Sequence, residues 1–355
     1  MEGISHVFRS LFGITLKPSS IIPGETWHPD VRKVEVVHEL EGKIGTIYCD
    51  LYKRSPGEPG KFDNPAHFTV RCSRVLHDEV ADDDVSVMEN REGSKFLVDP
   101  STGSQKKYQL PIVVLVTGFR RPSVKNGPTL LSFAETETLF HEMGHALHSV
   151  LSRTDFQHVS GTRVPMDFVE VPSIFMEYFV RNPLIISSFA QDFYKGEPMG
   201  VKIDSENYGA PSALEILETQ NQIQMAILDQ SYHSLSADEM DSFDSTAMLS
   251  QVQSRFHVVP YVENTAWQVQ FSHLHSYGSS YYSYAWSRRW SSRLYRNLLK
   301  GKKMEEWRPV GEFLKTQLLG LGGSRSPWIG LSNLGVVEPG EREGKYVKTD
   351  EIDLG

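Results

Sequence analysis

Residues 132–151 read SFAETETLFHEMGHALHSVL and carry the clearest structural signature of the 355-residue chain. Ser132 and Glu135 form a capping box, in which the serine accepts a hydrogen bond from the backbone and the glutamate reaches back three residues. Apolar residues then recur at helical spacing, at Phe140, Met143, Leu147, Val150 and Leu151. The pattern predicts a helix of about five turns with one face in the core.

The polar face of this helix carries the motif H-E-x-x-H at residues 141–145. Residues four apart on an α-helix lie on one face, about 6 Å apart, so the imidazoles of His141 and His145 can share one tetrahedral metal ion. Glu142 is not needed as a ligand, and it is placed to take a proton from an attacking water and pass it to a leaving amine. The motif therefore predicts a hydrolytic zinc site.

The same face permits a second interpretation. Glu137, His141, His145 and His148 would then form only a solvated polar stripe. A stripe so rich in histidine has no evident packing purpose on a helix well provided with apolar residues. We therefore favour the zinc site, and we take His148, which lies outside the motif, as a structural residue or one that supports the ligands from behind.

A catalytic zinc needs a third protein ligand and an open position for water. The downstream segment 166–178, MDFVEVPSIFMEY, offers Asp167, Glu170 and Glu177. Pro172 suits the first turn of a helix, so the segment predicts a second helix. Glu170 and Glu177 are two turns apart on one face, which lets one ligate while the other supports it. Spacing alone does not choose among the three carboxylates.

The composition is that of a globular protein, with 39% hydrophobic and 23% charged residues. A formal net charge of −9 argues against binding to nucleic acid or to an anionic membrane surface. The longest apolar run, Pro111 to Val116, is far too short to span a membrane. Cys49 and Cys72 exclude a disulfide-stapled scaffold and are expected to be buried. Residues 1–18 resemble neither a secretory signal nor a transit peptide.

The expected organisation has two parts, and the expected fold class is mainly α (α+β). Residues 33–117 predict a β-rich segment, with strands near 46–51, 68–72 and 111–117 and a polar loop over 76–106. Residues 130–335 predict a helical lobe that holds the zinc site. Beyond the first helix, its predicted helices cover about 172–179, 213–235, 245–256, 280–299 and 304–319. The charged stretch 336–355 is expected to be disordered.

Blocks along most of the chain resemble a known peptidase family. They read WHPDV at 27–31, FHEMGHALH at 140–148, QHVSGTR at 157–163, DFVEVPSIFMEY at 167–178, PYVENTAW at 260–267 and FSHL at 271–274. These blocks are similar to the M3 family, which includes thimet oligopeptidase and mitochondrial intermediate peptidase, with the closer likeness to the latter. The likeness runs from about residue 10 to about residue 335 and implies that residues 1–335 form a zincin-like M3 catalytic region.

The resemblance implies roles for the carboxylates. In the family, the glutamate of the D-F-x-E-x-P-S block is the third zinc ligand, which implies Glu170 here. Asp167 and Glu177 then become supporting residues. Glu137, one turn before His141, either orients a ligand imidazole or is a solvated carboxylate favoured by the helix dipole.

The segment 273–284, HLHSYGSSYYSY, predicts a loop that enters a helix. Its phenols offer donors for the oxyanion that forms when a peptide carbonyl is attacked, although an aromatic helix start is more often a packing feature. The resemblance implies that Tyr277 and Tyr284 stabilise the transition state and that Tyr281 and His273 contact the substrate.

The resemblance implies a metalloendopeptidase with one Zn²⁺ per chain that acts on peptides or precursor proteins. Such enzymes remove an N-terminal octapeptide from precursors imported into the mitochondrial matrix, and we expect a monomer there. The alternatives are a cytosolic thimet-type oligopeptidase and an inactive, truncated zinc-binding fragment. Family members are considerably longer, with an N-terminal half, absent here, that supplies much of the other wall of the substrate channel. We therefore expect this chain to bind one zinc and to cleave peptides poorly by itself.

Overall fold

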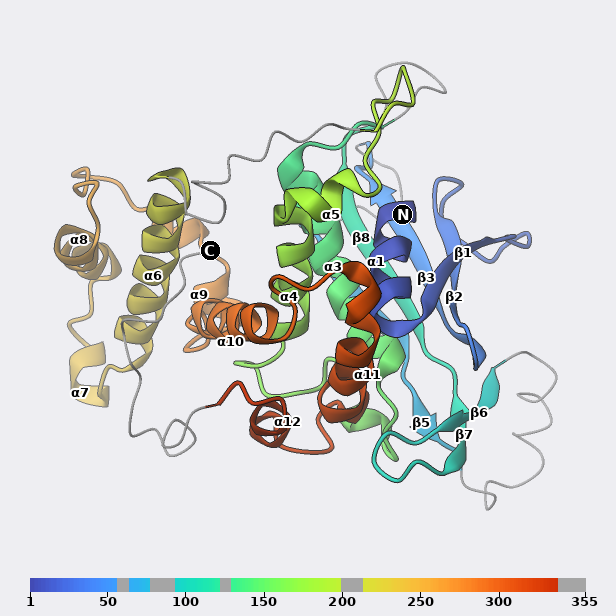
Figure 1. The fold of residues 1–355 in the computed structure, drawn as a ribbon. Coiled ribbons are helices and arrows are strands. Elements are labelled where there is room, and N and C mark those ends of the chain that lie inside the picture. Colours follow the sequence, from blue (N-terminus) through green and yellow to red (C-terminus); the bar gives the residue numbers. More distant parts are fainter. Residues whose placement is uncertain (56–63, 77–92, 122–128, 199–212, 338–355) are drawn as a thin grey trace.

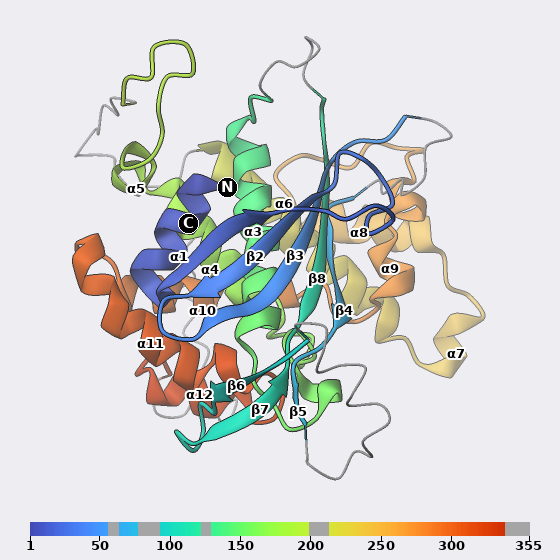
Figure 2. The same ribbon diagram turned by 90° about the vertical axis from the view of Figure 1, so that its right-hand side faces the viewer.

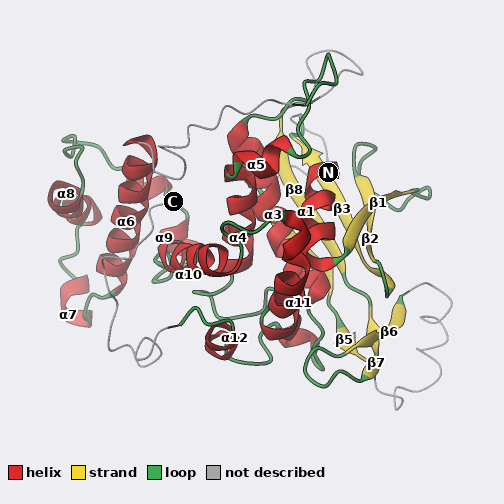
Figure 3. Cartoon of the chain, in the orientation of Figure 1, coloured by secondary structure: helices red, strands yellow, loops and turns green. Residues whose placement is uncertain are grey.

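The computed structural model describes residues 1–55, 64–76, 93–121, 129–198 and 213–337. Within this part of the chain the named strands lie between Ile14 and Phe119, and helices predominate in the rest (Figure 3). The expected mainly α (α+β) class, with a small β region near the N-terminus, is confirmed.

The larger sheet has five strands in the order β1-β2-β3-β8-β4. Their bounds are β1 (Ile14–Ser19), β2 (Arg32–His38), β3 (Gly42–Tyr52), β4 (Ala66–Arg71) and β8 (Ile112–Phe119). β3 and β8 are parallel and the other pairs are antiparallel, so β4 forms one edge of the sheet. Val113 and Leu115 of β8 are fully buried, which agrees with the nearly continuous apolar sequence of this interior strand.

A smaller antiparallel sheet corrects one prediction. It has the order β5-β7-β6, with β5 (Arg74–Val75), β6 (Ser94–Val98) and β7 (Gln105–Gln109). The polar loop expected over 76–106 is wrong for residues 94–98 and 105–106, because these residues pair as β6 and β7 and Leu97 is buried. Residues 77–92 of that predicted loop lie outside the described residues.

Two elements precede the β-rich segment that we predicted to begin at residue 33, namely β1 and the helix α1 (Glu2–Phe12). Ile4, Val7, Phe8 and Leu11 of α1 are buried, and their spacing is that of one helical face. Gly13 ends the helix in the left-handed conformation, with φ 62°. The amphipathic pattern of α1 was therefore present in the sequence, and our prediction missed it.

The described helices after the larger sheet are α3 (Phe133–Leu151), α4 (Val171–Arg181), α5 (Pro183–Ser187), α6 (Ala213–His233), α7 (Ala237–Met240), α8 (Ser245–Phe256), α9 (His273–Ser276), α10 (Ser283–Leu298), α11 (Trp307–Gln317) and α12 (Pro327–Asn333). The predicted helices are confirmed as α3, α4, α6, α8, α10 and α11, with shifts at their ends. The short helices α5, α7, α9 and α12 were not predicted. Short 3₁₀ turns lie at Gln157–Val159, Trp267–Gln270, Met304–Glu306 and Leu319–Leu321.

The helix that carries the H-E-x-x-H motif lies against one face of the larger sheet. In Figure 2 the sheet is in front and α3 and α4 lie behind it, and α3 contacts β3, β4 and β8. One large apolar core joins the sheet, α1, α3, α4 and α11. The motif is thus built on an element fixed by burial on both sides.

A second group of helices stands to one side of this body (Figure 1). α6 and α8 pack on each other around a separate cluster of buried residues, Leu228, Leu249 and Val252. α10 contacts both α4 and α6, so it connects the two groups. We call the segment from α6 to α9 the α6–α9 lobe.

The end of the described chain is packed rather than free. Val336 is buried and its carbonyl oxygen accepts a hydrogen bond from Arg293 at 3.1 Å, so the predicted disorder of 336–355 is wrong at its first residue. Residues 338–355 lie outside the described residues. Among the described helices, none has the length and apolar character needed to cross a membrane. Cys49 and Cys72 are buried free thiols, as predicted.

Candidate metal centre

The N-terminus of α3 is fixed as the sequence predicted. The backbone N–H of Glu135 donates to Ser132 Oγ at 3.2 Å, and the N–H of Ser132 donates to Glu135 Oε2 at 2.8 Å, which completes the capping box. The predicted apolar face is buried, with Phe140, Met143, Leu147, Val150 and Leu151 all in the core. The helix therefore has a defined start and a defined rotation about its axis.

Gly144, inside the motif, lets α3 and α4 approach closely. A Cβ atom at this position would lie 2.7 Å from the carbonyl oxygen of Pro172 and 2.7 Å from Ser173 Cα, both backbone atoms that cannot easily move away. A side chain here would push the start of α4 away from α3. The glycine thus brings Glu170, the residue before α4, up to the two histidines.

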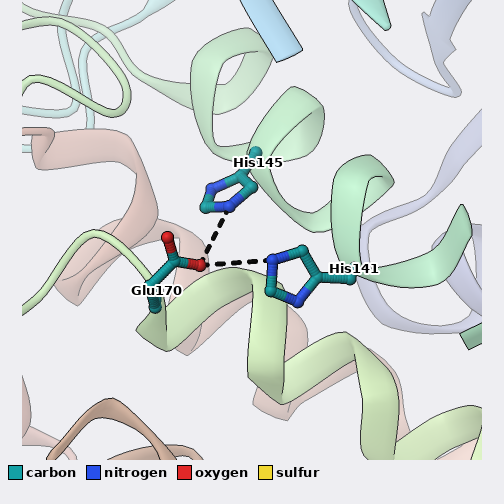
Figure 4. A group of neighbouring side chains, drawn as sticks. All are labelled: His141, His145 and Glu170. Atoms are coloured by element: carbon teal, nitrogen blue, oxygen red, sulfur yellow. Dashed lines mark ion pairs between the residues drawn. The ribbon is translucent and has the colours of Figure 1, made fainter. Parts of the chain in front are cut away.

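His141, His145 and Glu170 converge on one point (Figure 4). Glu170 Oε2 lies 3.2 Å from His141 Nε2 and 3.1 Å from His145 Nε2. Ligand atoms on a tetrahedral zinc are about 3.4 Å apart, given bond lengths near 2.0–2.2 Å, so these separations fit one ion. Two imidazoles and one carboxylate are also a donor set that suits zinc. Among the described residues these three form the group with metal-ligand spacing.

The carboxylates in and next to this group favour a positive charge at the point where the three side chains converge. Although burial opposes it, hydrogen bonds to Glu170 and Glu177 raise the pKa of His141 to about 10. Burial likewise disfavours the carboxylate form of Glu170, yet the neighbouring imidazoles hold its pKa well below the usual range. Ser173 Oγ donates to Glu170 Oε2 at 2.8 Å, which fixes the carboxylate. A cation at the shared point would neutralise this cluster.

His141 is oriented by Glu177. Its Nδ1–H donates to Glu177 Oε1 at 2.7 Å, and Glu177 is buried close to Arg181 and Arg288. Carboxylates commonly hold a ligand imidazole in this way. The predicted division, in which one of Glu170 and Glu177 ligates and the other supports, agrees with these positions.

Glu137 makes a different contact from the one we considered. Its Oε1 accepts a hydrogen bond from Arg181 Nε at 2.5 Å, while the orienting bond to His141 comes from Glu177. Among the described residues the hydrogen bond of Glu137 is thus to Arg181 and not to a ligand imidazole, and a supporting role for Glu137 remains a prediction. The carboxylate pairs with Arg181, whose guanidinium in turn lies 3.8 Å from Glu177.

Glu142 has the surroundings expected of a proton acceptor. It is 6% exposed, and its Oε2 has no hydrogen-bond partner among the described residues. Burial raises the pKa of its carboxyl group above the usual value. A cavity of about 300 Å³ lies in front of it and is lined by Pro65, Glu137, Thr138, His141, Glu142 and Glu177. A partly desolvated, unpaired carboxylate at a cavity is suited to take a proton from water.

His148 is not part of a polar stripe. It is fully buried, and neither ring nitrogen has a hydrogen-bond partner among the described residues. Burial lowers its pKa to about 3. The alternative interpretation of a solvated face is therefore wrong at this residue, and the structural interpretation agrees with its burial.

The predicted tyrosine residues lie on the segment that leads from α9 into α10. His273 Nε2 is 3.4 Å from the hydroxyl of Tyr284, and burial, together with the charge of Glu170, raises the pKa of Tyr284. Tyr277 is 53% exposed and its ring lies 5.8 Å from that of His273. Tyr284 is thus close enough to feel the charge of a predicted metal ligand, whereas Tyr277 faces solvent.

Tyr281 is largely occupied by contacts within the protein. Its hydroxyl donates to Gln222 Oε1 at 2.9 Å, and its ring packs on His273 and Tyr284. Its side chain is buried, so a role for Tyr281 as a substrate contact remains a prediction.

Asp229, on α6, anchors this segment and was missed by the sequence analysis. It is 1% exposed, and its two carboxylate oxygens accept from the N–H groups of Ser279 at 3.0 Å and Tyr281 at 2.9 Å. Ser279 has a φ of 63°, a conformation that a non-glycine residue rarely adopts without such support. The sequence held no spacing signal, because Asp229 and its partners are far apart along the chain.

Asp167 supports a neighbouring part of the fold rather than a ligand. Its Oδ2 accepts from the hydroxyl of Tyr282 at 3.5 Å, and its carbonyl oxygen accepts from Ser287 Oγ at 3.2 Å. These contacts join the segment before α4 to α10. A role for Asp167 in the site therefore remains a prediction.

Comparisons with known proteins agree on one family. The sequence profile of peptidase family M3 matches residues 1–345. "Mitochondrial intermediate peptidase 2" of Cryptococcus neoformans is 44% identical over 344 residues, covering 92% of this chain and 41% of the relative. "Mitochondrial intermediate peptidase" of Coprinopsis scobicola is 40% identical, covering 94% and 42%. That of Pleurotus djamor is 42% identical, with the same coverage of 94% and 42%. The chain spans less than half the length of these relatives.

Proposed function

Because this chain belongs to peptidase family M3, we propose that it is the zincin-like catalytic part of a zinc-dependent metalloendopeptidase. The observation that carries the proposal is the convergence of His141, His145 and Glu170 within 4.8 Å of one another, beside the unpaired carboxylate of Glu142. We assign one Zn²⁺ to these three ligands. Residues 1–335 form the catalytic region in this proposal.

The chemistry divides among the residues of the site. When bound, zinc would lower the pKa of a bound water to about 7 and polarise the substrate carbonyl. Glu142 takes the proton from the attacking water and delivers it to the leaving amine. Tyr284, with Tyr277, donates to the oxygen on which negative charge develops.

The substrate class follows from the relatives. They are named mitochondrial intermediate peptidases, so we propose that the whole protein acts in mitochondria, in the matrix, on precursor proteins from which it removes an N-terminal octapeptide. The protein acts as a monomer. The relatives contain more than twice the length matched here, and we propose that their additional part completes the substrate channel.

The test combines a metal count with cleavage. The purified chain is loaded with zinc, dialysed and measured by mass spectrometry for metal, and we expect one zinc per chain. The same sample is incubated with a precursor peptide whose first eight residues are the octapeptide, and with a matched peptide that lacks two of them. We expect slow release of the octapeptide from the first peptide only. A chain without zinc would disprove the metal site, and cleavage of both peptides at internal bonds would disprove the processing role.

A further inference from the structure

The two imidazoles of the metal-ligand group are held in different ways. His141 has a hydrogen bond from Nδ1 to Glu177, at 2.7 Å. His145 has none: its Nδ1 is buried without a partner among the described residues. Since a metal-bound histidine is normally oriented through the nitrogen that does not bind the metal, His145 needs another contact to fix its ring.

His67, on the edge strand β4, makes that contact. Its ring is stacked on the ring of His145, with centroids 4.5 Å apart and planes 16° apart. His67 is in turn fixed at its edge, because its Nε2 lies 3.2 Å from Thr162 Oγ1. The ring of His145 therefore packs against the ring of His67, whose position is fixed by Thr162.

The strand is fixed against the same helix. His67 and Thr69 lie on the face of β4 toward α3, whereas Val70 lies on the other face and is 66% exposed. Thr69 Oγ1 and Ser149 Oγ are 3.0 Å apart, and Ser149 is one turn beyond His145 on α3. This bond sets the position of β4 along α3 and so places His67 over His145.

Thr162 reaches His67 from a turn that is packed on α3. Gly161 has a φ of 61°, and a Cβ there would lie 2.8 Å from Ser149 Cα. The turn therefore passes directly over the helix beside Ser149. Three segments, β4, α3 and the turn at Gly161, meet behind His145.

We propose that His67 is a positioning residue that orients the imidazole of His145 toward the metal by ring stacking, in place of the missing hydrogen bond to Nδ1. The inference rests on the proposed function, since it requires that His141, His145 and Glu170 bind a metal. His67 is not a member of the metal-ligand group itself. It acts through His145 and requires no change of its own charge.

The test uses metal binding rather than cleavage. His67→Ala removes the stacked ring, and His67→Phe keeps a flat ring of similar size. Val70→Ala, on the exposed face of the same strand, is the control. Zinc affinity is measured by competition with a chelator, and the absorption spectrum of the cobalt-loaded protein reports the geometry around the ligands.

We expect His67→Ala to weaken zinc binding about 10-fold and to shift the cobalt spectrum, as the loss of an orienting contact does elsewhere. His67→Phe should restore both, and Val70→Ala should change neither. His67→Ala with wild-type affinity and spectrum would overturn the proposal, as would His67→Phe behaving like His67→Ala.

Two further outcomes keep the inference apart from the function. If the wild-type chain binds neither zinc nor cobalt, the proposed metal site fails together with this inference, whereas normal wild-type binding with an unchanged His67→Ala overturns only the inference. If His67→Ala does not fold, His67→Leu decides, because leucine fills the space without providing a flat ring: a shifted cobalt spectrum supports the stack, and an unchanged spectrum overturns it.

Discussion

The metal-ligand group and the tyrosine segment, which we propose to form one site, are supported by different means. The candidate ligands His141 and His145 lie on α3 and Glu170 lies directly before α4, and the two helices are buried in the large core and held close by Gly144. The segment with Tyr277 and Tyr284 is anchored by polar bonds to α6. The separate core of α6 and α8 is small, with Leu228, Leu249 and Val252 as its buried residues among those described.

This difference lets metal binding and cleavage be tested separately in the proposed site. Apolar packing over a large area fixes the backbone under the ligands, so metal binding is expected to tolerate changes in the α6–α9 lobe. Hydrogen bonds to a single buried carboxylate fix the tyrosine segment, so its position is expected to depend on Asp229. Changes in the two regions should therefore affect metal binding and cleavage separately.

We call α3, α4 and the metal-ligand group the metal side. The largest effect is expected at Glu142, which lies on this side but is not one of the proposed ligands. Glu142→Gln keeps the shape of the side chain and removes the proton acceptor, so we expect residual peptide cleavage to fall by a factor of about 10²–10⁴. Zinc content should stay at the wild-type value. Cleavage is measured with a quenched fluorescent peptide.

The control is Glu305→Gln, which changes an exposed carboxylate in the 3₁₀ turn Met304–Glu306, outside the lining of the cavity beside Glu142. The same loss of charge at this exposed position should leave cleavage nearly unchanged. If Glu142→Gln cleaved as fast as wild type, Glu142 would not be the proton acceptor, and if it lost its zinc, the carboxylate would have a structural role instead.

The next largest effect is expected at Glu177, behind His141. Glu177→Gln replaces a charged acceptor by a neutral one at a bond of 2.7 Å, and we expect zinc affinity to fall about 10- to 100-fold. Chelator competition measures this, again with Glu305→Gln as the control. Equal affinities for the Glu177 and Glu305 variants would mean that the orienting bond contributes nothing to metal binding.

The metal side was predictable because its signals are local. The capping box, the apolar period and the pair His141 and His145 all fall within one helix, so the sequence specified their geometry directly. The third ligand was not, because the spacing left Asp167, Glu170 and Glu177 open until the resemblance selected Glu170. The structure shows why, since the close contact of α3 with α4 at Gly144 brings Glu170 to the histidines.

Residues that act across the fold were out of reach of the sequence. His67 lies on an edge strand far from His145 in the chain. The apolar alternation of Phe68 and Val70 indicated the opposite face of this strand as the buried one, whereas both side chains are exposed. Asp229 is similar, because a single aspartate inside a helical sequence carries no sign of the two backbone N–H groups that it binds. Missing the helix α1 was an error of a different kind, because the apolar residues on its buried face recur at helical spacing in the sequence and we overlooked them.

The pKa of His148 reports whether water reaches the interior behind the metal-ligand group. Its pKa is about 3 in the folded chain, while an unfolded chain would bind a proton near pH 6.5, so the unfolded state gains protons first as the pH falls. His148 therefore leaves the free energy of unfolding unchanged above about pH 6.5 and lowers it progressively on acidification toward pH 3. Between pH 7 and pH 5 this residue should account for a loss of about 2 kcal/mol.

His148→Met removes the titrating group and keeps an apolar side chain of similar length. In urea unfolding of the metal-free protein, the variant should lose about 2 kcal/mol less than wild type between pH 7 and pH 5. His257→Met, at the exposed end of α8, is the control and should follow wild type. Identical pH dependence for His148→Met and wild type would show that His148 is hydrated and that the metal side is less tightly closed than its packing indicates.

The smallest effect, and the most direct test of the separation, is expected at Asp229. Asp229→Asn keeps the shape but turns one acceptor into a donor that faces the N–H of Ser279 or Tyr281, so the tyrosine segment loses a bond to a charged group. We expect residual cleavage to fall about 10-fold and the amide hydrogens of residues 279–281 to exchange faster, while zinc affinity is unchanged. Asp244→Asn, at the N-cap of α8 in the same lobe, is the control, because a general loosening of the lobe would act through it as well. A loss of zinc affinity in Asp229→Asn would mean that metal binding depends on the position of the tyrosine segment. Slower cleavage with unchanged zinc affinity would instead assign the tyrosine segment to the chemical step and leave metal binding to α3 and α4.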